Sequence, residues 1–313
     1  MVALIATSVV RGSQQGESHG GVYLIDLDGQ RVLQPVDWNT MDIDWQGRGW
    51  DRGLRGIDFD GDRVFIAASD ELFEYDRNFR QVASYRSPYL KHCHEIFRYR
   101  RRLYLTSTGF DSLLAFDLDR NRFSWGLHIT GQEERLRGTP FSPEGDKGPA
   151  ASNTLHINNV FCTNKALYFS GLRSGGLFSF DGSNVNLAVT LPQGTHNARP
   201  HRTGVLFNDT RSDAVRYVSR EGEERVFRVP VYEQSLLQNT DLDDTRVARQ
   251  GFGRGLCVLS DTLVAAGSSP STVTLHDLDS MQTTLSINLT MDIRNAIHGL
   301  EVWPYRELPN ASD

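Results

Sequence analysis

The sequence predicts an all-β fold, a single six-bladed β-propeller whose last blade combines one C-terminal strand with strands from the N-terminus. Three observations predict this fold. Short runs of β-branched and aromatic residues are separated by Gly, Asp and Asn, and few stretches have the apolar period of a helix. One frame of strand, turn, strand, turn and Asp-ended strand recurs along the chain. The last copy of this frame ends after one strand.

The recurring frame begins at a polar residue, and its second strand starts nine positions later. The five pairs of residues with this spacing are Arg55 and Val64, His94 and Leu103, Asn158 and Leu167, His196 and Val205, and Arg254 and Leu263. A sixth frame begins at His298. A constant spacing between structural landmarks is the signature of a repeat architecture, here a propeller blade.

The truncated sixth frame supplies a single strand, 298–303. Three apolar segments near the N-terminus, 3–10, 20–28 and 30–36, are expected to complete that blade, because a propeller must leave only short sheet edges. The frames therefore predict six four-stranded blades in one domain, 1–306, followed by a short tail, 307–313. Two polar insertions, at 126–153 and 231–250, are either functional loops or simple elaborations of the fold.

Composition restricts the classes of partner. The chain has 313 residues, 39% hydrophobic and 23% charged, with a formal net charge of −6. This balance disfavours electrostatic binding to nucleic acid or to an anionic membrane, and no apolar run is long enough to span a bilayer. Three cysteines without CxxC spacing indicate a reducing compartment. We therefore expect a soluble, cytoplasmic protein.

The residues that lead the six frames are all polar, and we expect them to line a central channel. They are Arg55, His94, Asn158, His196, Arg254 and His298. Two positions earlier, on the same strand face because side chains alternate with a period of two, lie Gly53, His92, His156, Gly194, Phe252 and Ala296. Five of the nine histidines fall on these two layers.

A cluster of imidazoles favours a divalent transition metal such as Fe, Cu, Zn or Mn over Ca or Mg, which prefer oxygen ligands. The predicted ligands are His94, His156, His196 and His298, and it is open whether His196 or His201 faces the channel. Histidines from different blades could leave one coordination position for water or substrate.

The arginines point to an anionic substrate, because a guanidinium group binds carboxylate or phosphate in two-pronged fashion. The predicted substrate-binding residues are Arg55, Asn158, Arg199 and Arg254. His92, Arg55 and Arg254 are the predicted catalytic residues, with His92 moving protons.

Two classes of function follow. The first is a metal-dependent enzyme, a lyase, hydrolase or oxygenase, that acts on a small anionic molecule in the channel. The second is a propeller without metal that binds a ligand or a protein without catalysis. A metal-free acid–base site, and polar residues that only satisfy one another and trapped water, are further interpretations of the same lining.

Four stretches of the chain resemble a bacterial family of conserved proteins of unknown function, some of which carry tetratricopeptide repeats. The stretches are His92-Cys-His-Glu-Ile96, His156-Ile-Asn-Asn-Val160, Thr195-His-Asn-Ala-Arg-Pro200, and Gly253-Arg-Gly-Leu256 with the Gly-Ser-Ser-Pro270 segment after it. The family's second and third motifs read closer to His-x-Asn-Gly and Pro-His-Ser-Pro-Arg, so Asn159 and residues 195–197 depart from it. The resemblance implies a propeller and no established activity.

Overall fold

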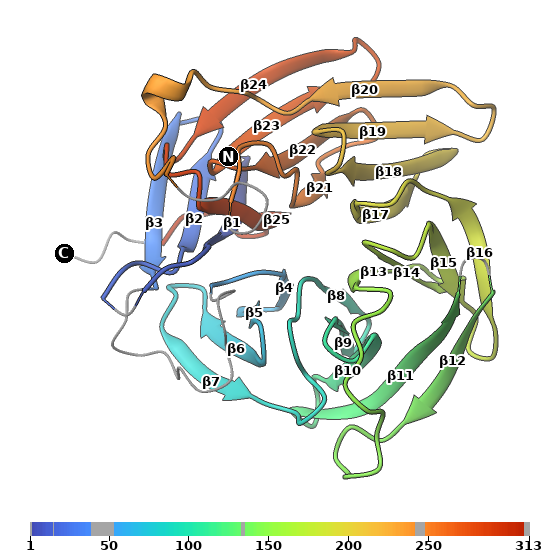
Figure 1. Ribbon diagram of the computed structural model, residues 1–313. Coiled ribbons are helices and arrows are strands. Elements are labelled where there is room, and N and C mark those ends of the chain that lie inside the picture. Colours follow the sequence, from blue (N-terminus) through green and yellow to red (C-terminus); the bar gives the residue numbers. More distant parts are fainter. Residues whose placement is uncertain (1, 15, 39–52, 133–134, 242–247, 310–313) are drawn as a thin grey trace. The chain divides into compact units, whose positions relative to one another are not determined.

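The protein is described by a computed structural model that covers residues 2–14, 16–38, 53–132, 135–241 and 248–309. Within these residues the regular structure is 25 strands and one 3-10 helix, η1 (Gln234–Leu236). The strands form six antiparallel sheets (Figure 1). They confirm the predicted fold class, an all-β six-bladed β-propeller. No helix in the described part of the chain has the length and apolar character needed to cross a membrane.

One sheet is built from both ends of the chain, as predicted. Its strand order is β25-β1-β2-β3, with bounds β25 (Asn295–Val302), β1 (Ala3–Val10), β2 (Gly21–Asp26) and β3 (Arg31–Asp37). The pairing of β1 with β25 runs from Leu4 opposite Val302 to Val10 opposite Asn295. The C-terminal strand thus begins three residues before the predicted start at His298.

The chain divides into two compact units, and each is described by itself. The first unit contains residues 1–55, 77–80 and 200–313, and the second contains 56–76 and 81–199. The boundary between them falls inside strand β17 (Thr195–His201). The predicted single domain over 1–306, with its tail, stays a prediction.

The second unit contains three sheets. The first is β4 (Ile57–Asp60), β5 (Arg63–Ala68), β6 (Glu71–Asp76) and β7 (Gln81–Tyr85). The next is β8 (Ile96–Tyr99), β9 (Arg102–Ser107), β10 (Ser112–Asp117), β11 (Arg122–Gln132) and β12 (Arg135–Phe141). The third is β13 (Ile157–Cys162), β14 (Leu167–Gly171), β15 (Gly176–Phe180) and β16 (Val185–Thr190).

The prediction of four strands in every blade is wrong for the second of these sheets, which has five. The extra strand comes from the insertion at 126–153. Its first residues lengthen β11, and β12 pairs back along them from Phe141 opposite Gly126 to Arg135 opposite Gln132 (Figure 1). The alternating apolar residues Leu127 and Ile129 are buried there, which explains why this polar segment continues the sheet.

The first unit contains the other strands. The sheet that includes β17 continues with β18 (Gly204–Asp209), β19 (Ala214–Ser219) and β20 (Glu224–Arg228). The last sheet is β21 (Leu256–Val258), β22 (Leu263–Ser268), β23 (Thr272–Asp277) and β24 (Gln282–Asn288). The insertion at 231–250 carries η1, and its residues 242–247 lie outside the described residues.

The aspartate at the end of the third strand of the repeat has a structural reason. In Asp117, Asp181 and Asp277 the Oδ1 atom accepts hydrogen bonds from the two backbone N–H groups that follow in the turn, at 2.8 to 3.0 Å. These backbone hydrogen bonds hold the pKa of each carboxyl below its usual value. The repeat therefore encodes the turn that sends the chain into the fourth strand of the frame.

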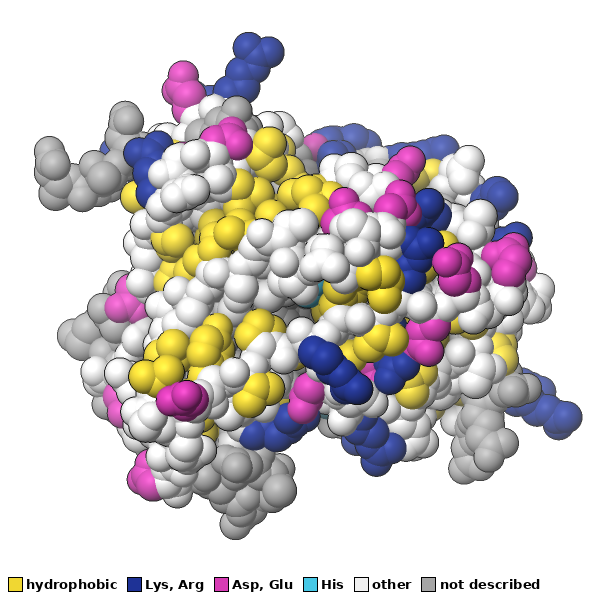
Figure 2. All heavy atoms as spheres, turned by 90° about the horizontal axis from the view of Figure 1, so that it is seen from above, with side chains coloured by type: hydrophobic (Ala, Val, Ile, Leu, Met, Phe, Trp, Pro, Cys, Tyr) yellow, Lys and Arg dark blue, Asp and Glu magenta, His cyan; other side chains and the backbone are white. Residues whose placement is uncertain are grey.

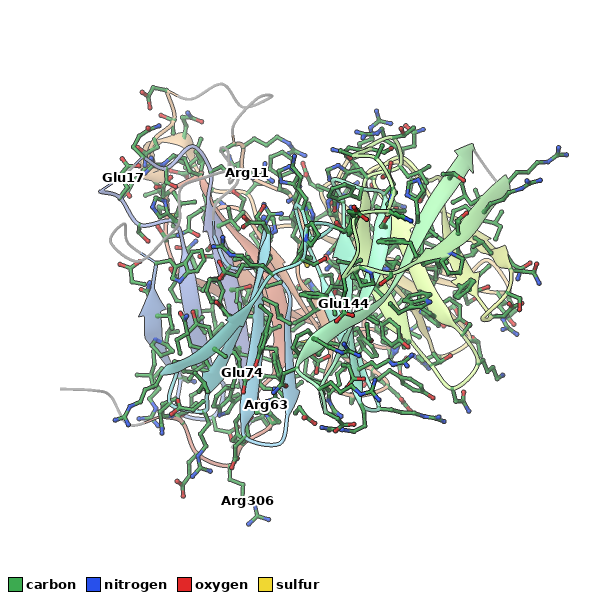
Figure 3. All side chains as sticks on the ribbon, turned by 90° about the horizontal axis from the view of Figure 1, so that it is seen from below. Arg11, Glu17, Arg63, Glu74, Glu144 and Arg306 are labelled. Carbon is green, nitrogen blue, oxygen red and sulfur yellow. The ribbon has the colours of Figure 1, made fainter. Side chains whose placement is uncertain are left out.

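Charged side chains of both signs are interspersed on the face shown in Figure 2, and neither sign forms a continuous field there. Some of them form defined pairs. In Figure 3, Arg63 and Glu74 lie side by side on β5 and β6. Arg63 donates from Nε to Oε1 and from Nη2 to Oε2 of Glu74, both at 2.9 Å. This two-pronged geometry is the strong form of an arginine–carboxylate pair.

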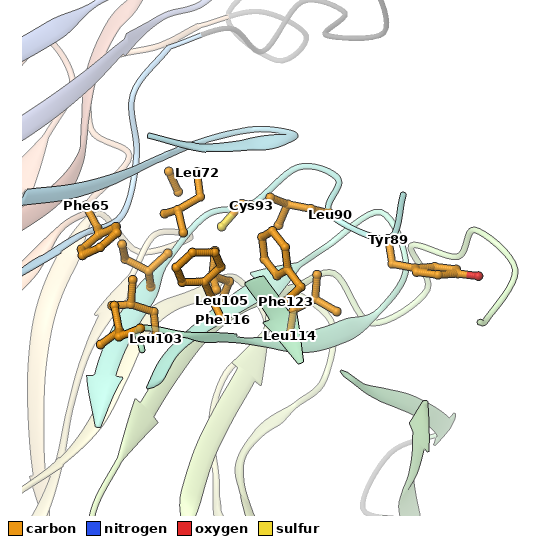
Figure 4. Close-up of a cluster of buried hydrophobic side chains, with 13 residues drawn as sticks. Phe65, Leu72, Tyr89, Leu90, Cys93, Leu103, Leu105, Leu114, Phe116 and Phe123 are labelled. Atoms are coloured by element: carbon orange, nitrogen blue, oxygen red, sulfur yellow. The ribbon is translucent and has the colours of Figure 1, made fainter. Parts of the chain in front are cut away.

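Apolar clusters fill the space on the sheet faces of each unit. In the second unit one cluster gathers thirteen buried residues from β5, β6, β9, β10 and the segments around them (Figure 4). Phe116 is fully buried in it, with its ring centroid 4.6 Å from that of Tyr85 and 5.3 Å from that of Phe123. The alternating strand residues of this cluster bury one face of each of two neighbouring sheets, as expected between propeller blades.

Candidate functional site

All six blade-leading residues are buried although all are polar. Their side chains are those of Arg55, His94, Asn158, His196, Arg254 and His298. Three of them, Arg55, His94 and Arg254, lie just before the first strand of their sheets, and the other three lie within β13, β17 and β25. Buried polar groups are retained only with partners, so each of these positions requires an explanation.

Five of the six residues two positions earlier do not continue the strand, so the prediction of a second layer on the same strand face is wrong for them; Ala296 lies in β25 with His298. Gly53, His92, His156, Gly194 and Phe252 all have positive φ, between 46° and 127°. A left-handed residue turns the chain and ends the two-residue alternation of an extended strand. His92, His156 and Phe252 hold this conformation without being glycine, which is the uncommon case.

Polar side chains of one sheet fix the backbone that leads the next. In the second unit, Asn158 donates from Nδ2 to the Thr195 carbonyl at 3.3 Å, and Asn159 donates to the Ala198 carbonyl at 2.6 Å. In the first unit, Asn208 donates to the Gly255 carbonyl at 3.2 Å. Asn158, predicted to bind substrate, therefore has a positioning role. Its Oδ1 is buried without a hydrogen-bond partner among the described residues.

Two of the predicted metal ligands, His94 and His156, lie together in the second unit. Their ring centroids are 5.2 Å apart at an interplanar angle of 64°. The His94 Nδ1 atom is 2.8 Å from the His92 carbonyl, and the His156 Nδ1 atom is 2.9 Å from Asn153 Oδ1. Because these oxygens only accept, each Nδ1 carries the proton, which makes Nε2 the acceptor atom of each neutral ring.

The other predicted ligands have different surroundings. His196 Nδ1 is 3.3 Å from the Gly194 carbonyl. His298, in the first unit, receives a hydrogen bond at Nε2 from Arg254 Nη1 at 3.2 Å, and this bond uses the lone pair that a metal would need. His201, the alternative to His196, bonds the Asp261 carbonyl through Nε2 at 2.9 Å.

No group of three or more His, Cys, Asp or Glu in the part of the chain described here is placed to hold a metal ion. The four predicted ligands belong to both units, three to the second and His298 to the first. The metal site and the channel that would join these residues therefore stay predictions.

Arg254 and Arg55, predicted to be catalytic and to bind substrate, both belong to the first unit. The Arg254 guanidinium lies 5.8 Å from the centroid of the Phe252 ring, and those of Arg249 and Arg11 lie 4.4 and 4.7 Å from it. Arg55 is fully buried, and its carbonyl accepts a hydrogen bond from the Thr7 hydroxyl. These arginines thus have structural contacts of their own. His92, the third predicted catalytic residue, lies in the second unit, with Nδ1 3.4 Å from Ser69 Oγ.

Sequence reasoning missed Glu95, which forms the centre of a polar cluster with Asn197 and Arg199, here called the Glu95 cluster. Asn197 Nδ2 donates to Glu95 Oε2 at 2.9 Å, and Arg199 Nη2 lies 3.7 Å from Glu95 Oε1. The Arg199 guanidinium also lies 5.4 Å from the centroid of the Phe161 ring. Arg199, a predicted substrate-binding residue, thus faces a carboxyl group of its own chain.

Two carboxyl groups near Arg199, those of Glu95 and Asp58, have raised pKa values. Burial raises the pKa of Glu95 from 4.5 to about 7, against the opposing effects of Arg199 and of the Asn197 hydrogen bond. Burial also raises the pKa of Asp58 to about 6, although the backbone N–H groups of Arg98 and Phe59 donate to its carboxylate. Arg199 also acts on Asp58 electrostatically. Two carboxyl groups near this arginine therefore change charge close to neutral pH.

A sequence signal for Glu95 existed, because it follows His94 directly within His92-Cys-His-Glu-Ile96. Strict strand alternation places Glu95 opposite His94, but neither residue lies inside a strand, since β8 begins at Ile96. The 102 positions between Glu95 and Asn197 leave no local pattern that could join them.

No protein family model and no curated protein matches this sequence. The fold is similar to that of solved structures with low sequence identity. A chain of the crystal structure of a nidogen/laminin complex has a TM-score of 0.59 and 9% identity, over 96% of this chain and 97% of that chain. A protein of unknown function from Bacteroides caccae has a TM-score of 0.59 and 8% identity, over 97% and 99%. These similarities support the fold alone.

Proposed function

We propose that the protein binds a small anionic molecule at the Glu95 cluster and exchanges a proton with it or with water through Glu95. The observation that carries this proposal is the loose pair of Arg199 and Glu95. The 3.7 Å between Nη2 and Oε1 is longer than a hydrogen bond, and the carboxyl has a pKa of about 7. A well-formed structural ion pair has the opposite properties, a short contact and a low carboxyl pKa.

The chemistry follows from competition for Arg199. A ligand carboxylate or phosphate that approaches the guanidinium replaces Glu95 as its counter-charge. Glu95 then loses the electrostatic effect that favours its ionised form, and it takes up a proton from solvent. A protonated carboxylic acid beside a bound anion is a hydrogen-bond donor and a general acid, with a pKa in the range that suits proton transfer at neutral pH.

The test is calorimetric titration of the protein with inorganic phosphate, malonate and citrate. Each titration is run in two buffers of different ionisation enthalpy, because proton uptake then appears as a difference in observed heat. We expect one of these anions to bind with uptake of a fraction of a proton near pH 7. Arg199→Gln should weaken binding at least about tenfold, since charge-assisted hydrogen bonds to a largely buried arginine are strong.

The matched control is Arg137→Gln, which removes an exposed arginine of β12 in the same unit. It should bind as the unaltered protein does. Equal affinity of Arg199→Gln and the unaltered protein for the bound anion would contradict the proposal. Failure of all three anions to bind the unaltered protein at millimolar concentration would also contradict it. Thermal unfolding should first show that both variants keep the transition of the unaltered protein.

A second candidate is a metal-dependent reaction on the same class of substrate by a lyase, hydrolase or oxygenase. The 5.2 Å separation of the His94 and His156 rings supports it, because two neutral imidazoles could contribute Nε2 atoms to one ion. Elemental analysis of protein purified without a histidine tag should then find near-stoichiometric Fe, Cu, Zn or Mn. The double variant His94→Ala and His156→Ala should lose it, and unchanged metal content would contradict this assignment of ligands.

We also propose that the protein is cytoplasmic and that its partner is a small molecule. We do not propose a nucleic acid or a membrane as its partner. The net charge of −6 supports this setting. Membership in the bacterial family of unknown function that the sequence resembles is part of the same proposal. The motifs His92-Cys-His-Glu-Ile96 and His156-Ile-Asn-Asn-Val160 support it.

A further inference from the structure

A cavity in the second unit, separate from the Glu95 cluster, is lined by aromatic side chains. Its volume is about 350 Å³. The rings that line it are those of Tyr99, Tyr104, Trp125 and Phe180. They come from the end of β8, from β9, from β11 and from the end of β15. A volume of about 300 Å³ or more is in the range that holds a small organic ligand.

The cavity lies at the opposite end of the strands from the Glu95 cluster. Glu95 precedes β8, whereas Tyr99 ends it. In the same way Asn158 is near the start of β13, and Cys162, which lines the cavity, ends that strand. The Arg199 guanidinium contacts Phe161, the residue before Cys162, so separate variants of each site are needed to distinguish them.

The aromatic rings form walls that a flat ligand could contact. The ring centroid of Trp125 is 6.3 Å from that of Tyr104 at an interplanar angle of 82°, and 6.1 Å from that of Phe180 at 32°. Tyr104 and Trp125 are half-buried, so each presents part of its ring to the cavity. Perpendicular and tilted rings of this kind accept another aromatic ring face-on or edge-on.

Two cations border these walls, Arg102 and Lys165, and both are exposed. Neither forms an ion pair with a carboxylate among the residues described. Asp181 is the one acidic residue in this lining, and its Oδ1 accepts the backbone N–H groups of Ser183 and Asn184 in its own turn. The charged groups at the cavity are therefore two cations and one carboxylate that is already hydrogen-bonded.

We propose that this cavity binds a planar aromatic carboxylate, with its ring between Trp125, Tyr104 and Phe180 and its carboxylate at Arg102 and Lys165. The neutral groups of the lining agree with this ligand. Burial raises the pKa of the Tyr104 hydroxyl, which therefore stays a hydrogen-bond donor, and burial raises the pKa of the Cys162 thiol to about 12. Outside the lining, Asp58 acts electrostatically on Cys162, and Asp117 of β10 lies opposite Arg102. Arg102 and Lys165 are the groups that attract the ligand's carboxylate.

The experiment uses 1-naphthoate as the probe, with the full chain and the quenching of tryptophan fluorescence as the readout. We expect saturable quenching with 1:1 stoichiometry, checked by calorimetry. A neutral analogue, 1-naphthalenemethanol, and an anion without a ring, acetate, should each bind more weakly. The double variant Arg102→Gln and Lys165→Gln should lose about threefold to tenfold in affinity, as expected for two exposed charges.

A matched control, Lys91→Gln with Arg137→Gln, removes two exposed charges of the same unit away from the cavity. It should keep the affinity for 1-naphthoate. Trp125→Phe should abolish most of the quenching, which assigns the signal to this tryptophan. Equal affinity of the Arg102/Lys165 variant and the control would overturn the proposal, and so would equal binding of the neutral analogue. Binding of a proline-rich peptide in place of 1-naphthoate would overturn it in favour of a protein ligand.

The result for Arg199→Gln separates this inference from the proposed function. That variant lacks the cation of the Glu95 cluster and should bind 1-naphthoate with the affinity of the unaltered protein. If Arg199→Gln lost 1-naphthoate binding while the Arg102/Lys165 variant kept it, the aromatic anion would be assigned to the Glu95 cluster, and the proposal for the cavity would be wrong.

Discussion

Asn197 donates a hydrogen bond to Glu95 at 2.9 Å across 102 positions of sequence, and it does so from a left-handed backbone conformation with φ of 50°. Asparagine is one of the few residues that adopts this conformation readily. The turn at Asn197 directs its amide toward the carboxyl group, and Arg199 follows two residues later. A buried ionisable group with a raised pKa and a specific hydrogen-bond partner is the arrangement expected at a functional site.

The first prediction concerns the pH dependence of stability that Glu95 causes. Its pKa is raised from 4.5 to about 7 on folding, so between these values the folded protein binds more protons than the unfolded chain. Stability must therefore fall as the pH rises from about 4.5 to about 7. Glu95→Gln should flatten this slope and stabilise the protein above pH 7, by an amount on the order of a few kcal/mol.

Thermal unfolding between pH 5 and pH 8 measures this effect. Asp58, whose pKa is raised to about 6, contributes a smaller slope of the same sign that should persist in Glu95→Gln. The exposed Glu221→Gln should leave the profile unchanged. A slope in Glu95→Gln as steep as in the unaltered protein would show that Glu95 titrates at its ordinary value.

The fold was predictable from the sequence because the features that specify each blade lie close together in the chain and recur in several blades. The aspartate of the strand-ending turn, visible at Asp117, Asp181 and Asp277, marks the same place in three blades, and a spacing of nine positions marks the start of the second strand. The truncated frame at His298 predicted pairing of the last strand with β1, which the register of β25 confirms. The fifth strand, β12, was not predictable, because it belongs to an insertion outside the repeat.

The site was less predictable, for a physical reason. The repeat identified which residues lead each blade, and all six are buried polar residues. It could not show what each one contacts. The alternation that was used to choose second-layer residues fails where His92 and His156 turn the chain with positive φ. Arg199 contacts Glu95, and this contact depends on how two sheets pack against each other. The periodicity of the sequence does not predict that packing.

A second prediction concerns acid stability and His276. This histidine of β23 is buried against Phe227, with ring centroids 4.6 Å apart, and burial lowers its pKa from 6.5 to about 4. The unfolded chain therefore binds more protons between these values, and stability is lost as the pH falls from about 6.5 toward 4. His276→Gln should reduce this loss. Denaturant titrations at pH 7 and pH 4.5 measure it, and an equal loss in both proteins would contradict the assignment.

A third prediction concerns the buried cluster of Figure 4. Phe116→Ala should destabilise the protein by about 3–5 kcal/mol, because the fully buried ring leaves a cavity among Phe65, Tyr85 and Phe123. Val82→Ala on β7 is the control, since the Val82 side chain is 62% exposed, and its effect should be within about 0.5 kcal/mol. Urea unfolding measures both. A loss below about 1 kcal/mol for Phe116→Ala would mean that the site collapses around the smaller side chain.

The last prediction compares two ion pairs of the same residue types by double-mutant cycles. Arg63 and Glu74 form two parallel hydrogen bonds, and the Tyr85 hydroxyl donates to the same carboxylate at 2.8 Å, with Glu74 9% exposed. Arg122 and Glu144 meet at 3.1 Å with both side chains about half exposed. The side chains of the first pair are already held in place by their neighbours, so forming the ion pair costs them less conformational entropy than it costs two exposed side chains. We therefore expect a coupling energy of about 1 kcal/mol for the first pair and below about 0.3 kcal/mol for the second.

Urea unfolding of Arg63→Met, Glu74→Gln and the double variant, with the corresponding Arg122 and Glu144 variants, gives both coupling energies. At 1 M NaCl the second coupling should vanish while most of the first remains. A coupling that is equal in the two pairs would show that the two-pronged geometry contributes nothing to stability.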